Sequence, residues 1–92
     1  MAEPSAELIS RTLARYQKIV GNEIQKIRFI HQPHGLDAVI SELLSFAGKV
    51  ELDDERFGWY RHSLAIHVYN KILRIYPQSQ EAALYLAFNA GC

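Results

Sequence analysis

Four histidines are the side chains of this chain best suited to hold a metal ion or move a proton at neutral pH. His31 and His34 flank Pro33, so regular helical spacing does not apply to them. His62 and His67 are five residues apart, which on a helix turns them to different faces, about 140° apart. A helical metal pair needs two ligands three or four residues apart, as in HExxH, and no such motif is present. We therefore expect no metal site and interpret the histidines as surface or hydrogen-bonded residues.

A run of carboxylates, from Glu51 through Asp53, Asp54 and Glu55, is the second candidate for chemistry. A calcium loop would need ligands at alternating positions, a central glycine and a glutamate at its twelfth position, and these are missing. Asp53 instead has the position of a helix N-cap, and the two acids after it would sit where the helix dipole favours negative charge. The run therefore predicts the start of a helix rather than a catalytic pair.

Nucleophiles are scarce. Cys92 is the last residue, and neither a nearby histidine nor a helix N-terminus would activate its thiol. A single cysteine also excludes a disulfide framework and a zinc site built on several cysteines. No serine lies in a GxSxG elbow, and the five glycines are too scattered to form a phosphate loop. We expect a non-catalytic protein that needs no cofactor.

Composition limits the partners. Ten basic and ten acidic residues cancel, and 49% of the chain is hydrophobic, which is enough for a packed core. The longest basic face lies on a long helix, unlike the short recognition helix of a helix-turn-helix, so we expect it to be solvated and expect no nucleic-acid partner (Arg11, Arg15, Lys18, Lys26, Arg28). No apolar run reaches ~18 residues, and the first six residues are polar and unlike a secretory signal. We expect a cytoplasmic domain that protein partners bind.

Apolar residues recur at intervals of three and four, between breakers at Pro4, Pro33 to Gly35, Gly48 and Pro77. This pattern predicts a single domain over 1–92 with four helices, at about 5–30, 36–47, 54–75 and 80–90. Gly48 has the position of a left-handed residue that ends the second helix. Short connections favour an all-α antiparallel four-helix bundle, although a tetratricopeptide-like array would give the same pattern. N-caps are expected at Ser5, Asp53 and Ser79, a Leu52–Phe57 staple at the third helix, and core positions at Leu13, Val20, Leu43, Leu64, Val68 and Ile72.

The third helix is apolar almost all round, which is typical of a central helix. Trp59, Ile66, Tyr69, Leu73 and Tyr76 form a second apolar face, roughly opposite the first. Either the other helices wrap this helix, or part of its second face docks a partner. From this second face we predict a partly exposed aromatic patch around Trp59 and Tyr76, with His62 and the fourth helix at its edge. The candidate partner-binding residues are Trp59, His62, Ile66, Leu73 and Tyr76.

Residues 60–90 resemble a tetratricopeptide helix pair. Ala65, Tyr69 and Pro77 match the small, aromatic and proline positions of its second helix, and Glu81 and Ala82 fit the start of the next one. No 34-residue period is visible. This resemblance implies a small helical adaptor or chaperone that binds a helix of a partner protein.

A second resemblance covers more of the chain. A long first helix, a proline turn at Pro33, an Asn70-Lys71 pair late in the third helix, and Ser79 and Glu81 opening the fourth are similar to the immunity proteins against pediocin-like bacteriocins. Members of that family are cytoplasmic four-helix bundles, many of them lysine-rich, whereas this chain is neutral. The resemblance implies that the protein protects the producer cell by binding the complex of bacteriocin and membrane receptor, the mannose phosphotransferase permease.

Overall fold

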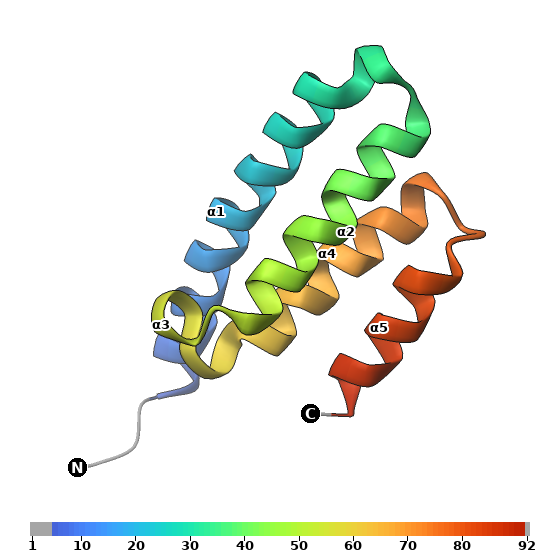
Figure 1. The fold of residues 1–92 in the computed structure, drawn as a ribbon. Coiled ribbons are helices and arrows are strands. Elements are labelled where there is room, and N and C mark those ends of the chain that lie inside the picture. Colours follow the sequence, from blue (N-terminus) through green and yellow to red (C-terminus); the bar gives the residue numbers. More distant parts are fainter. Residues whose placement is uncertain (1–4, 92) are drawn as a thin grey trace.

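A computed structural model describes residues 5–91 and is all-helical over that range, with no strand among these residues. Four long helices alternate in direction along the chain, which makes an antiparallel bundle (Figure 1). This confirms the predicted fold class. The elements are α1 (Ala6–His31), the 3-10 turn η1 (Gln32–His34), α2 (Leu36–Leu52), α3 (Asp54–Phe57), the 3-10 turn η2 (Gly58–Tyr60), α4 (Arg61–Ile75) and α5 (Gln80–Ala90).

The three predicted N-caps are confirmed. The backbone N–H of Leu8 donates to Ser5 Oγ at 3.1 Å, and that of Ala82 donates to Ser79 Oγ at 3.2 Å. The backbone N–H of Arg56 donates to Asp53 Oδ1 at 3.0 Å. Each bond satisfies one of the amide groups that a helix leaves unpaired at its start, so local sequence determines where α1, α3 and α5 begin.

The predicted end of the second helix is wrong. α2 continues through Gly48 to Leu52, and Gly48 is not among the glycines with positive φ. Val50 is only 2% exposed, so extending the helix buries an apolar side chain and outweighs the ~1 kcal/mol cost of an internal glycine. The predicted staple is also wrong, because Leu52 is 80% exposed while Phe57 is buried.

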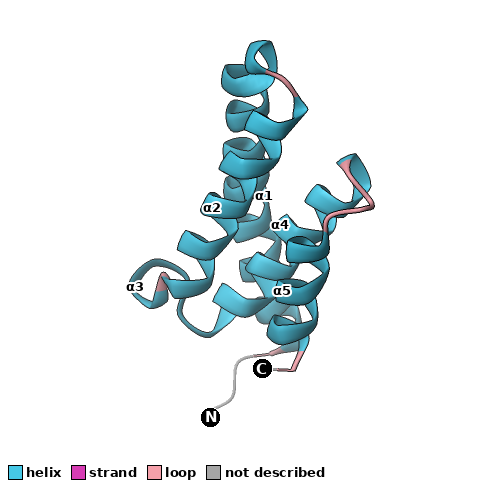
Figure 2. Cartoon of the chain, turned by 45° about the vertical axis from the view of Figure 1, so that its right-hand side comes forward, coloured by secondary structure: helices cyan, strands magenta, loops and turns pink. Residues whose placement is uncertain are grey.

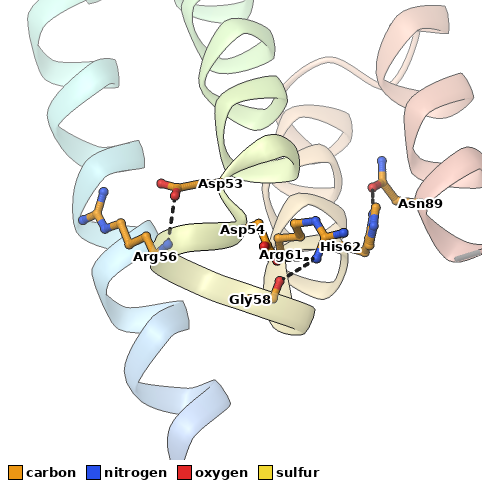
Figure 3. Close-up of polar contacts among 7 residues, drawn as sticks. All are labelled: Asp53, Asp54, Arg56, Gly58, Arg61, His62 and Asn89. Carbon is orange, nitrogen blue, oxygen red and sulfur yellow. Dashed lines mark hydrogen bonds and ion pairs between the residues drawn. The ribbon is translucent and has the colours of Figure 1, made fainter.

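The predicted helix over 54–75 is interrupted. Gly58 has φ of +56°, a conformation that L side chains rarely adopt, so the single turn α3 is separated from α4. Arg61 closes this break, because its Nη1 donates to Gly58 O at 2.9 Å and pairs with Asp54 Oδ1 at 3.2 Å (Figure 3). Tyr16 on α1 packs edge-on against the rings of Phe57 and Tyr60, which holds the turn against the bundle.

The core gathers around α4, which packs against α1, α2 and α5. In Figure 1 it runs between α2 and α5, and Figure 2 shows α5 lying over it. Five of the six predicted core residues are fully buried, and Leu13 is half-buried against the same cluster. α4 is therefore the central helix, and α1, α2 and α5 wrap it. α5 packs mainly on α4 and leaves the side of α2 open.

Candidate functional site

The two aromatic residues of the predicted patch lie at opposite ends of α4. Trp59 is in η2 before the helix and is 75% exposed, and Tyr76 caps its far end and is 40% exposed. Fifteen residues of helix separate them by about 22 Å. Both are exposed as expected, but they lie in two places rather than in one patch.

The other three predicted residues are less exposed than these two aromatic side chains. Ile66 is half-buried, and Leu73 packs against the core cluster. His62 faces α5, where its Nδ1 lies 2.7 Å from Asn89 Oδ1 (Figure 3). Leu73 and His62 therefore contribute to the packing of α4, whereas Ile66 stays partly accessible.

Asn89 joins three helices. It is 2% exposed, and its Nδ2 donates to Glu51 Oε1 on α2 and to the carbonyl of Tyr85, each at 2.8 Å. Because Nδ2 is the donor in both bonds, Oδ1 must accept, and the Nδ1 of His62 carries the hydrogen. The network fixes the C-terminal end of α5 against α2 and α4.

Tyr69 and Tyr85 lie beside this network. Their rings stack with centroids 5.7 Å apart and an angle of 18° between planes. Burial raises the pKa of Tyr69 to about 12, and the negative charge of Glu51 acts in the same direction. Tyr69 is therefore a neutral phenol at physiological pH.

An open groove runs between α2 and α5, and this tyrosine pair forms part of its lining. Two cavities of about 340 and 450 Å³ both contact Leu44 and Glu81, so they adjoin along the same side of the molecule and together make up the groove. The cavity at the start of the helices is lined by Asp37, Ile40, Ser41, Leu44, Tyr76 and Glu81. The other is lined by Leu44, Ser45, Gly48, Lys49, Glu51, Leu52, Tyr69, Glu81 and Tyr85. The groove thus has α2 for one wall, the start of α5 for the other, and Tyr69 of α4 at its base.

Charge is unevenly distributed along the groove. Asp37 and Glu81 stand at the end where α2 and α5 begin, and Lys49 stands towards the other end. The carboxylate of Glu51, which also lines the groove, accepts a hydrogen bond from Asn89. Gly48 faces open space, because a Cβ placed on it would meet no heavy atom within 4 Å. The site can therefore hold an elongated, partly apolar ligand, and its polar groups differ between the two ends.

Metal-ligating side chains are not clustered in residues 5–91. No group of three histidine, cysteine or carboxylate residues in this range could hold a metal ion, and Cys92 lies outside it. Within the same range no helix is long and apolar enough to span a membrane. Two further cavities lie at the α1–α2 end, one beside Val39 and Ile75 and one beside Phe29 and Pro33. Neither of these two cavities is lined by both acidic and basic side chains.

Neither protein-family models, nor curated proteins, nor solved structures match this chain. The groove and the Asn89 network are the features that the sequence analysis missed. One signal for the network was available, because Asn89 follows Ala82 and Leu86 at helical spacing and so puts an amide on the buried face of α5. No comparable signal marks the groove, which depends on how far α5 lies from α2.

Proposed function

We propose that this chain is a non-catalytic protein that binds a partner protein, and that the groove between α2 and α5 is the binding site. The observation that carries this proposal is the pair of adjoining cavities with two helical walls and apolar side chains from Ile40 to Leu52. Grooves of this kind accept the apolar face of an amphipathic helix. Leu84, on the helix that forms one wall of the groove, is a further exposed apolar side chain.

Bacteriocin immunity is the most specific form of this function. The resemblance implies it, and the antiparallel four-helix bundle is the fold that the resemblance leads us to expect. In this role the protein acts from the cytoplasm on the complex of bacteriocin and permease. A helical segment of that complex would then occupy the groove.

A helical adaptor or chaperone is the second candidate. The groove itself favours it, since a site with two helical walls can bind a helix of any partner that presents the matching apolar face. A stable heterodimer purified from the native cell would support this candidate over immunity.

Expression in bacteriocin-sensitive cells separates these possibilities. Wild type and Gly48→Ala should protect against one bacteriocin and not others. Gly48→Trp should fold with an unchanged melting temperature but lose protection, because its indole would fill the groove. Trp59→Ala tests the exposed aromatic residue at the end of α4. Lost protection in Trp59→Ala and full protection in Gly48→Trp would move the site away from the groove.

A further inference from the structure

We propose that the groove between α2 and α5 selects an amphipathic helix that carries an acidic residue near its N-terminus and a basic residue near its C-terminus. This inference rests on the proposed function. The helix runs antiparallel to both α2 and α5.

The shape fits one helix of about four turns. The lining residues of α2 extend from Asp37 to Leu52, which at 1.5 Å per residue is about 22 Å, or some 15 residues of a bound helix. Ser41, Ser45 and Gly48 are small, so the backbone of a bound helix can approach α2 closely. Ile40 and Leu44 supply apolar contact between them.

The charges distinguish the two ends of the groove. Asp37 and Glu81 are exposed carboxylates that line the same cavity, and Lys49 is an exposed amine that lines the other cavity. None of the ion pairs found within residues 5–91 involves these three side chains. A ligand with a base at the Asp37 end and an acid at the Lys49 end would pair with all three. The two ligand charges would lie about three turns apart, on one helix face.

The helix dipoles determine the direction. α2 and α5 both begin at the Asp37 and Glu81 end, so both direct their partial positive charge there. The C-terminus of a bound helix carries partial negative charge and is stabilised at that end. Helices also favour acids in their first turn and bases in their last, so the ligand charges agree with the same direction.

Two synthetic helices test this selection. Both are 15-residue peptides, acetylated and amidated, with the same leucine face; one has glutamates in its first turn and arginines in its last, and the other has these charges exchanged. Titration by fluorescence anisotropy at low salt should show ~10-fold tighter binding of the first peptide, as expected for two or three exposed ion pairs. The preference should shrink as salt is added.

Variants provide the controls. Asp37→Lys combined with Glu81→Lys should reverse the preference, and Asp37→Asn combined with Glu81→Gln, which perturbs the helix starts less, should weaken it. Gly48→Trp should abolish binding of both peptides, while Gly48→Ala should leave it intact. Circular dichroism confirms that each variant is folded before its titration is used.

The outcomes separate this inference from the proposed function. Equal binding of the two peptides, lost in Gly48→Trp, would overturn the charge selection and leave the groove as a helix site. Failure of both peptides to bind, or binding that Gly48→Trp does not change, would overturn both. A wild-type dimer in sedimentation that Gly48→Trp converts to monomer would also overturn the inference, since a second copy would then fill the groove.

Discussion

Asn89 is the residue on which the seating of α5 depends. It is a buried amide whose oxygen and nitrogen are both used, by His62 on α4 and by Glu51 on α2. A buried polar group costs free energy when it loses its partner, and the cost is larger when that partner is charged. The network therefore makes the position of α5 specific, whereas apolar packing alone would tolerate small shifts along α4.

Asn89→Ala should lower the free energy of unfolding by ~2–3 kcal/mol, because it leaves the Glu51 carboxylate and the His62 ring without the amide. Chemical denaturation measures this. The matched control is Asn70→Ala on the exposed side of α4, which should change stability by less than ~0.5 kcal/mol. Equal effects of the two substitutions would contradict the role given to the network.

His67 makes stability depend on pH. Burial lowers its pKa from 6.5, and the positive charges of Lys71 and Arg74 lower it further. The unfolded chain therefore binds this proton more readily than the folded chain, so stability is full above pH 6.5 and falls as the pH drops below it. Melting curves at about pH 7.5 and about pH 5 should show this loss, and His67→Gln should reduce it. Exposed His34→Gln serves as the control and should leave the loss unchanged.

Two glycines should respond in opposite directions to substitution by alanine. Gly58→Ala should destabilise by ~1–3 kcal/mol, because φ of +56° strains an L residue at the break between α3 and α4. Gly21 lies inside α1 with open space around its Cβ position, so Gly21→Ala should stabilise by up to ~1 kcal/mol. Thermal melts of both variants measure the contrast. A gain at Gly58 would show that α4 can extend back through the turn.

Capping chemistry and apolar spacing predicted the helix starts and the central place of α4, because both signals lie within a few residues. The same local signals failed at glycines. Gly48 has the sequence features of a helix end, yet the burial of Val50 carries α2 past it, and Gly58 lies inside an apolar pattern that gives no sign of a break. Tertiary packing decides such cases, and it involves residues far apart in the chain.

The candidate site was harder to predict than the fold. Sequence patterns identified exposed aromatic residues such as Trp59 but could not show that α4 keeps Trp59 and Tyr76 apart. The groove comes from the distance between α2 and α5, two helices that contact α4 more than each other. Asp37 and Glu81 are 44 positions apart in sequence, and only the parallel course of their helices places them at one end of the groove.

The whole molecule is elongated, 52 Å by 25 Å by 21 Å, because α1 is much longer than the other helices. Its 26 residues extend about 39 Å, but only Val20 and Ile24 on it are fully buried. Its first turns carry Leu8 and Ile9, which are 49% and 38% exposed. Stability is therefore concentrated around α4 and the facing part of α2. The N-terminal turns of α1 bury little apolar surface.

Native-state hydrogen exchange should reveal this gradient. Amides of α4 from Leu64 to Ile72 and of α2 near Leu43 should exchange only through global unfolding, because burial of their side chains makes any local opening expose the core. Amides in the first two turns of α1 should exchange orders of magnitude faster, through fraying that breaks few apolar contacts. α5 should lie between them, and Asn89→Ala should move it towards the fast group while leaving α4 protected. Uniform protection from Ser10 to Ala90 would contradict this picture, since it would mean that α1 and α5 unfold only together with the core.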